Sequence, residues 1–247
     1  MTQHVHQHHP PVTLDAIAAI RYYVDRIVSS IEGMKVLLLD EETTQIVSTV
    51  YSQTTILERE VYLVERLNPD VPHEPMMHLR AVCFLRPTEE NAALLARELA
   101  QPKYAEYHIF FSNICSANLL RSVAEADELE SVRQVQEYYA DYTAINQELF
   151  SLSLPQPLAL SLPNPAPAVL TRTVQGLASA LLSFKKKPAQ IRYQGTSPAA
   201  RQVATALAQH VAADQIFEFR RSDGPCLLIL DRRDDPVTPL LSQWTYQ

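Results

Sequence analysis

Carboxylates gather at two places where an apolar run ends, and side chains of this type could bind Mg²⁺ or accept a phosphoryl group. The first group is DEE at 40–42, at the end of the apolar run KVLLLD at 35–40. The second group is DRRDD at 231–235, directly after the run CLLIL at 226–230. Parallel strands deliver polar groups to the carboxyl edge of a sheet, where α/β folds usually bind ligands. Both groups are therefore candidate sites.

The first group lacks the partners that phosphoryl transfer needs. A haloacid-dehalogenase phosphatase uses an Asp-x-Asp pair, and Glu42 takes the second position here. A receiver domain needs a separate phospho-acceptor aspartate and a lysine at later strand ends, where this sequence has Arg66, Arg86 and Asn113. We therefore expect Asp40 to lie in a solvated strand-to-helix turn, and we keep an aspartate-based phosphatase or receiver-like phosphotransfer domain as the alternative function.

The second group is also a weak metal site. Arg232 and Arg233 lie among its aspartates and would neutralise a bound cation. Asp235 precedes Pro236, a preferred first residue of a helix. Turn and helix-cap roles are therefore expected for these aspartates.

Motifs for cofactor chemistry are absent from the sequence. Phosphate-binding loops need clustered glycines, and the chain has only four, none within ten residues of another. There is no H-E-x-x-H pair of metal ligands and no G-x-S-x-G nucleophile elbow. We therefore predict no catalytic residues, no metal, no cofactor and no enzymatic activity. The glycines are Gly33, Gly176, Gly195 and Gly224.

Composition excludes several further classes. With 21 Lys and Arg against 28 Asp and Glu, the net charge is −7, and no basic stripe offsets it, so nucleic acid is not an expected partner. No apolar run approaches the roughly 18 residues that span a bilayer. The N-terminus has no secretory signal, which favours a cytoplasmic protein. The chain is expected to be a monomer. Three scattered cysteines, Cys83, Cys115 and Cys226, are expected to be buried free thiols.

Apolar runs and helical periodicities alternate along the first half of the chain. This alternation predicts an α/β fold with a doubly wound parallel sheet. The first helix is expected at 12–32, capped by Thr13 and ended by Gly33. The expected strands are 35–40, 61–66, 79–85 and 107–112, and the expected later helices are 88–100, 118–126 and 129–142.

A second α/β unit is expected from 144–154 onward. A proline-rich surface loop at 155–167 follows this opening segment. Two or three strands are too few for a stable sheet, so the second unit is expected to be incomplete and the chain to be a fragment. The expected elements are helices at 171–185 and 198–213 and strands at 190–193 and 226–231.

Several sequence segments resemble those of a known protein family. LLILDRRDDPVTPLLSQWTYQ at 227–247 resembles the hallmark segment of the SM family, the syntaxin-binding chaperones of SNARE-mediated membrane fusion. Further segments resemble the branch of that family that serves vacuolar protein sorting. They are MKVLLLDEETT at 34–44, EVYLVERL at 60–67, RPTEEN at 86–91, YAEYHIFFSNI at 104–114 and INQELFSLSL at 145–154.

The resemblance implies the N-terminal part of an arch-shaped protein of three domains. The resemblance does not cover the polar, His-rich tail at 1–11, which is expected to be disordered from its composition. The syntaxin-binding first domain would occupy 12–139. The first part of the α/β second domain would occupy 140–235, and the helical third domain would begin at 236–247.

The same resemblance implies a function. The chain would be a non-enzymatic SNARE regulator that binds a trans-Golgi or endosomal syntaxin, and its SNARE complex, through the N-terminal peptide and the helical domain of the syntaxin. It would promote SNARE assembly and vesicle fusion in endosomal and vacuolar transport. It would be cytoplasmic and associated with Golgi and endosomal membranes indirectly, through the syntaxin. With most of the third domain missing, it could bind a syntaxin without performing the full assembly function.

An apolar pocket for the syntaxin N-terminal peptide is implied on the outer face of the first domain. It maps to Leu119, Leu120 and Val123 on one expected helix and to Val132 and Val135 on the next. Leu120 is the expected floor. Adjacent leucines cannot both point to the centre of one buried helix face, which independently favours an exposed one. The alternative is that all five are ordinary core residues.

A cleft face that holds the helical bundle of the syntaxin is implied as a second surface. It maps to Arg59, Glu65 and Arg66. Ser52 stands where some relatives have a basic residue, so contacts through charge would be weaker here. The alternative is that all of these residues are ordinary solvated surface.

Overall fold

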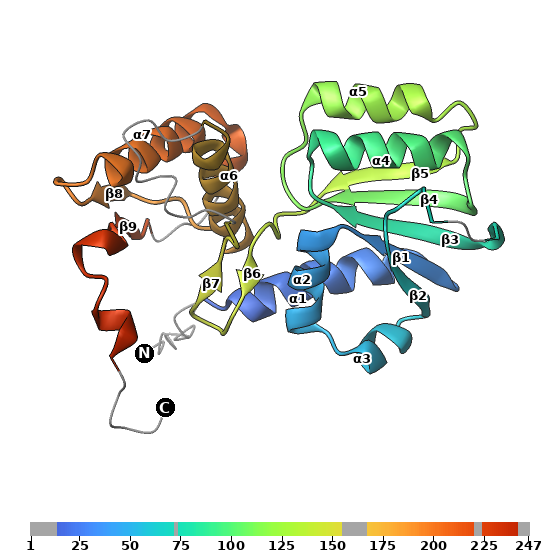
Figure 1. The fold of residues 1–247 in the computed structure, drawn as a ribbon, viewed down its shortest axis with the longest axis horizontal. Helices are drawn as coiled ribbons and strands as arrows, with labels where there is room; N and C mark the ends of the chain where they lie inside the picture. Colours follow the sequence, from blue (N-terminus) through green and yellow to red (C-terminus); the bar gives the residue numbers. More distant parts are fainter. Residues whose placement is uncertain (1–13, 72–73, 155–166, 220–223, 242–247) are drawn as a thin grey trace, which may run out of the picture.

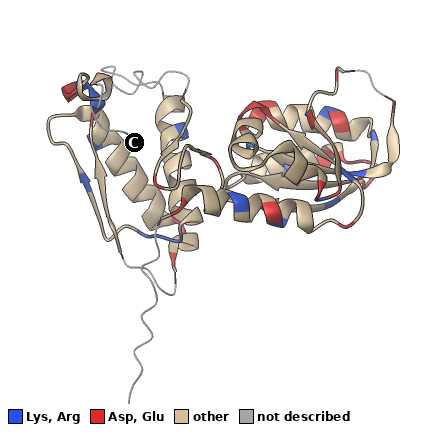
Figure 2. Ribbon diagram, turned by 90° about the horizontal axis from the view of Figure 1, so that it is seen from below, with Lys and Arg blue, Asp and Glu red and all other residues tan. Residues whose placement is uncertain are grey.

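A computed structural model describes residues 14–71, 74–154, 167–219 and 224–241. Figure 1 shows two bodies: a sheet with helices on both faces, and a smaller body at the C-terminal side. We call the first the sheet unit and the second, built from α6, α7, β8 and β9, the second unit. In Figure 2, Lys and Arg of the described chain lie scattered among Asp and Glu. Within the described part, no helix combines the length and the apolar character needed to cross a membrane.

The sheet unit contains a five-stranded, all-parallel sheet in the order β2-β1-β3-β4-β5. This order, which grows in both directions from the first strand, confirms the predicted doubly wound α/β fold. The interior strand β1 is buried at all five positions because helices cover both faces. The strands are β1 Lys35–Leu39, β2 Val61–Arg66, β3 Met76–Leu85, β4 Tyr104–Phe111 and β5 Val132–Glu137.

Two apolar clusters, one on each face of the sheet, form the core. On one face α1 and α2 pack over Leu37 and Phe84, and on the other α4 and α5 pack over Leu38 and Ile109. The short helix α3 contacts β2. The helices are α1 Ala16–Ser29, α2 Glu41–Val50, α3 Gln53–Leu57, α4 Glu89–Ala100 and α5 Ala117–Ala126.

The first helix is shorter than predicted. Its N-cap is Asp15, whose side chain accepts a hydrogen bond from Ala18 N, and Thr13 lies outside the described residues. The helix ends at Ser29, and Gly33 follows in the left-handed region at φ 78°, where a residue without Cβ fits. By contrast, α4 matches the predicted helix at 88–100, with Thr88 as its N-cap.

The predicted helix at 129–142 is wrong, because this segment contains strand β5. Val132 and Val135 are three residues apart, a spacing that places both on one face of a helix. In a regular strand the same spacing would place them on opposite faces. The pairing of β5 with β4 shifts register between Tyr107 and His108, and Arg133 is the extra residue. The two valines therefore pair with Tyr107 and Ile109, which both pack on the α4–α5 side.

The segment predicted to open the second unit forms a small hairpin. Its strands are β6 Thr143–Ala144 and β7 Phe150–Ser151. Ala144 and Phe150 pack with the α1–α2 cluster, so the hairpin lies against the sheet unit. The proline-rich loop at 155–167 falls almost entirely outside the described residues.

The second unit alternates helices and strands, and its two strands pair in parallel. Leu182, Leu207 and Phe217 form its core between the two helices. Leu228 is exposed, and Cys226 is also exposed, contrary to the predicted burial of all three cysteines. The elements are α6 Pro167–Ser183, β8 Gln190–Tyr193, α7 Pro198–Ala213 and β9 Cys226–Ile229, with short 3-10 turns at Gln215–Phe217, Arg232–Asp234 and Thr238–Leu240.

Candidate functional site

A groove of about 590 Å³ lies between α5 and the edge strand β5. The N-cap of the helix is Ser116, whose hydroxyl accepts a hydrogen bond from Leu119 N at 3.3 Å. The strand is the last of the sheet, so its outer edge has no neighbouring strand among the described residues. The groove is lined by Leu120, Val123, Ala124, Asp127, Glu130, Val132, Arg133 and Val135.

The two adjacent leucines of α5 point in different directions, as predicted. Leu119 packs against the core of the α4–α5 face, whereas the Leu120 residue is 36% exposed and lines the groove. The deepest lining residue is Val123 at 3% exposure, so it, rather than the predicted Leu120, is the floor, and Leu120 forms a wall. Val135, 41% exposed, adds a second open apolar side chain. The groove therefore presents apolar surface to solvent on a rigid helix and strand.

The turn that closes one end of the groove is ordered by Asp127. Its carboxylate accepts hydrogen bonds from Ser131 N at 2.8 Å, from Ser131 Oγ at 2.8 Å and from Val132 N at 3.0 Å. Glu130, in the same turn, adopts a left-handed backbone at φ 50°. These bonds fix the distance between α5 and β5, so the groove is preformed.

The start of α5 is tied to the end of β5. The Glu137 carboxylate accepts a hydrogen bond from Cys115 N at 2.7 Å. Burial, with a smaller contribution from Glu137, raises the pKa of the Cys115 thiol to about 11. The thiol therefore stays protonated at neutral pH and acts as a packed apolar group.

The opposite edge strand, β2, has a second exposed surface. Val64 pairs with Leu37 and Arg66 pairs with Leu39, so both face the α1–α2 side, and Tyr62 is the extra residue at a register shift between Val61 and Leu63. Tyr62 is 58% and Val64 41% exposed. We call Tyr62, Val64, Arg66 and the nearby Arg59 the β2 surface.

Ion pairs hold the cations of the β2 surface in place. Arg66 Nη2 lies 2.8 Å from Glu41 of α2, and Arg59 Nη2 lies 2.8 Å from Asp25 of α1. Glu65 points to the other face, where it accepts a hydrogen bond from Tyr104 Oη at 3.4 Å. Of the three residues predicted for one cleft, Arg59 and Arg66 therefore lie on the α1–α2 side of the sheet and Glu65 on the opposite side.

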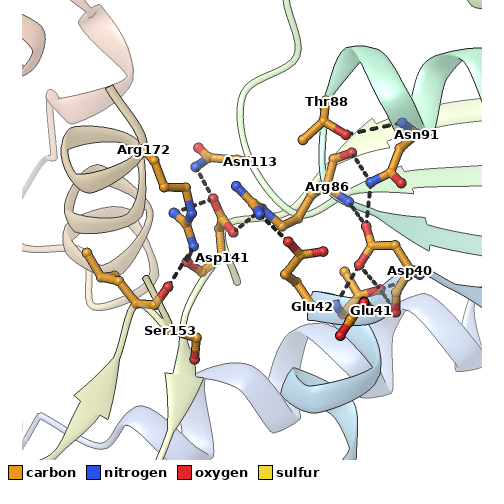
Figure 3. A network of polar contacts seen from close by, with 12 residues as sticks. Asp40, Glu41, Glu42, Arg86, Thr88, Asn91, Asn113, Asp141, Ser153 and Arg172 are labelled. Atoms are coloured by element: carbon orange, nitrogen blue, oxygen red, sulfur yellow. Dashed lines mark hydrogen bonds and ion pairs between the residues drawn. The ribbon is translucent and has the colours of Figure 1, made fainter. Parts of the chain in front are cut away.

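Asp40 has a structural role at the carboxyl edge of the sheet (Figure 3). It caps α2 through Oδ1, which accepts from Thr43 N at 2.7 Å. Oδ2 accepts from Arg86 N at 2.6 Å and from Asn91 Nδ2 at 2.7 Å. The residue is 7% exposed, so the predicted solvated turn is wrong. Because neither oxygen is free of an internal hydrogen bond, the phosphotransfer alternative has no support in this geometry.

We expect Asp40→Ala to lower the free energy of unfolding by about 2–4 kcal/mol, since it removes a helix cap and leaves buried donors unpaired. Urea denaturation measures this. The matched control is Asp15→Ala, which removes an exposed cap of α1 and should cost about 1 kcal/mol. Equal losses in the two variants would contradict the assigned role of Asp40.

The aspartates of the second candidate site also make local contacts. Asp231 caps the turn Arg232–Asp234 and accepts hydrogen bonds from Arg233 and from Ser197 Oγ. These bonds hold the pKa of Asp231 well below its usual range. Pro236 does not start a helix, contrary to prediction. Among the described residues, no three His, Cys, Asp or Glu side chains come together as metal ligands.

A sequence model of the Sec1 family matches residues 35–247 of the chain. The chain belongs to the Sec1 family. This confirms the predicted SM family, since solved structures of SM proteins share its fold.

Individual Sec1-family relatives are similar over nearly the whole chain. Vacuolar protein sorting-associated protein 45 of Mus musculus is 50% identical over 237 residues, which covers 95% of this chain and 41% of the relative. The solved structure of the SM protein Vps45 is 47% identical with a TM-score of 0.88, covering 95% of this chain and 45% of that chain. A structure of SM protein Vps45 in complex with Qa SNARE Tlg2 is 48% identical with a TM-score of 0.88, covering 94% and 42%.

These similarities confirm the predicted branch of the family. The chain spans about two fifths of the length of the curated relatives that it matches.

In this Sec1-family chain the structure brings four of the five predicted pocket residues into one groove. They are Leu120, Val123, Val132 and Val135, while Leu119 belongs to the core. Sequence reasoning missed Tyr62 and Val64 of the β2 surface, because VYLV at 61–64 is a continuous apolar run without the alternation that marks an exposed face.

Proposed function

We propose that this chain is the SNARE-binding, non-enzymatic N-terminal part of an SM protein in endosomal and vacuolar transport. Its α5–β5 groove would bind the N-terminal peptide of a trans-Golgi or endosomal syntaxin. The observation that carries the proposal is Leu120, which opens an apolar groove to solvent on a helix whose neighbouring leucine is core. Support for a SNARE partner comes from the 48% identical relative, which is described in complex with the Qa SNARE Tlg2.

The groove suits one apolar side chain of an extended peptide. Burying a leucine-sized side chain against Leu120, Val123 and Val135 would contribute about 1.5–3 kcal/mol. Arg133 and Glu130 on the rim provide polar groups for the peptide backbone. Because Asp127 preorders the turn, little entropy is lost on binding.

We assign residues 12–139 to the first SM domain, 140–235 to the first part of the second, and 236–247 to the start of the third. Support for the first boundary comes from the sheet unit, whose five strands end at Glu137. Residues 1–13 and 242–247, which include the His-rich tail, lie outside the described residues.

The β2 surface is the second contact that we propose, for the helical domain of the same syntaxin. Tyr62 and Val64 supply exposed apolar area on the edge strand, and Arg59 and Arg66 flank them. Such a centre of apolar groups with charged neighbours is the usual composition of a protein interface. Glu65 would contribute from the other face of the strand. Contact with the membrane would be indirect, through the syntaxin.

We expect Val64→Arg to weaken binding of the cytosolic region of the syntaxin by about tenfold. A valine side chain that becomes buried on binding contributes roughly 1.5 kcal/mol to the free energy of binding. Binding of the isolated N-terminal peptide should not change, and surface plasmon resonance measures both. Leu149→Arg is the matched control, since Leu149 is also exposed but lies on the β6–β7 hairpin. Equal effects of the two variants would remove the β2 surface from the proposal.

The function as a whole is tested by gel filtration with the cytosolic region of a trans-Golgi or endosomal syntaxin. A stable complex is expected, and its stability should fall when the N-terminal peptide of the syntaxin is deleted. Separate elution at micromolar concentrations of both proteins would contradict the proposed function.

A further inference from the structure

Buried charges gather where the sheet unit meets the second unit. Asp141, 1% exposed, lies 3.1 Å from Arg86 Nε and 3.1 Å from Arg172 Nη1, and accepts a hydrogen bond from Asn113 Nδ2 at 2.9 Å. Figure 3 shows these side chains pointing toward one another from three parts of the fold. Arg86 follows β3, Asn113 follows β4, and Arg172 belongs to α6. We call these four residues the junction cluster.

Further bonds in the junction cluster cross between the units. Asn113 Nδ2 also donates to the carbonyl of Gln175 in α6 at 3.0 Å, and Asp141 N donates to Ser179 Oγ in α6 at 2.9 Å. Arg172 Nη2 donates to the carbonyl of Asp141 at 3.2 Å. Each of these bonds requires one particular position of α6 relative to the sheet.

Apolar contacts flank the junction cluster. Ile114 and Tyr139 pack against the core of the second unit, and Phe184, which directly follows α6, packs with Tyr142 and Phe150. Apolar contact is non-directional, so these groups could hold the units together at more than one angle. Charge-assisted hydrogen bonds depend strongly on geometry, and the desolvation cost of buried charges offsets much of their attraction.

We propose that the junction cluster sets the angle between the sheet unit and the second unit rather than strengthening their docking. The apolar contacts hold the units together, and the buried charges select one orientation. The α5–β5 groove and the β2 surface are thereby held in a fixed relation to the second unit, which matters for any partner that contacts both units.

The proposal is tested by electron–electron distance measurements in the full chain. Spin labels are attached through Glu90→Cys on α4 and Gln209→Cys on α7, in a Cys226→Ser background, because both labelled positions are exposed. Wild type should give one narrow distance. The apolar replacement Arg86→Met with Asp141→Leu and Arg172→Met should keep or raise the melting temperature but give a broad or double distribution.

A folded triple variant that keeps the single narrow distance would overturn the proposal. If the triple variant does not fold, the milder double variant Asp141→Asn with Arg172→Gln provides the test. A narrow, unshifted distance distribution in this double variant would also overturn the proposal. The control Asp70→Asn with Arg97→Gln removes an exposed ion pair of the sheet unit. It should change neither the distance nor the melting temperature.

Discussion

Leu120→Arg is expected to weaken binding of a syntaxin N-terminal peptide by at least about ten- to hundredfold. The variant loses about 1.5–3 kcal/mol of apolar burial and places a charge at the wall of the groove. The fold should persist because Leu120 is partly exposed, as circular dichroism would verify. Fluorescence anisotropy with a labelled peptide measures the affinity.

A matched control separates the groove from general surface effects. Leu149→Arg changes a leucine that is 51% exposed on the β6–β7 hairpin, and it should leave peptide affinity unchanged. Peptide binding that survives Leu120→Arg, or that falls equally in both variants, would place the peptide elsewhere on the chain.

Asp141→Ala is expected to lower the free energy of unfolding by about 3–5 kcal/mol. Removing this carboxylate takes away the partner that the partly buried Arg86 and Arg172 guanidinium groups share, and leaves Arg86 paired with Glu42. Native domains have only about 5–15 kcal/mol of stability in total, so urea denaturation should show a large decrease. This loss does not conflict with the retained or raised melting temperature expected for the triple variant of Arg86, Asp141 and Arg172. The penalty in Asp141→Ala comes from arginines that lose their shared partner, and the triple variant removes those arginines as well.

Asp70→Ala provides the comparison for that loss. Asp70 pairs with Arg97 on the surface, where both side chains are more than half exposed. Surface pairs contribute about 0–1 kcal/mol, so this variant should unfold close to wild type. A loss for Asp141→Ala no larger than that for Asp70→Ala would show that the junction charges are not effectively buried.

Local sequence patterns predicted much of the fold. The strand Val61–Arg66 and the helix Pro198–Ala213 have the predicted bounds, because an apolar run marks the first and Ser197 with Pro198 marks the start of the second. The doubly wound sheet followed from the alternation of strands and helices. In each case the signal lies within a few neighbouring residues.

Features that depend on distant pairing could not be predicted. The register shift at Arg133 arises from the pairing of β5 with β4 and made a strand look helical. The burial of Asp40 depends on Arg86 and Asn91, about fifty residues away. The candidate groove combines both situations: the exposure of Leu120 was deducible from its neighbour Leu119, but the position of Val135 opposite it required the strand.

The most direct test of the central claim is a calorimetric titration of the chain with unlabelled N-terminal peptides of trans-Golgi and endosomal syntaxins. We expect saturable binding of one peptide per chain, lost in Leu120→Arg and retained in Leu149→Arg. Absence of binding to every such peptide by the folded wild-type chain would contradict the assignment of the α5–β5 groove as a syntaxin-peptide site.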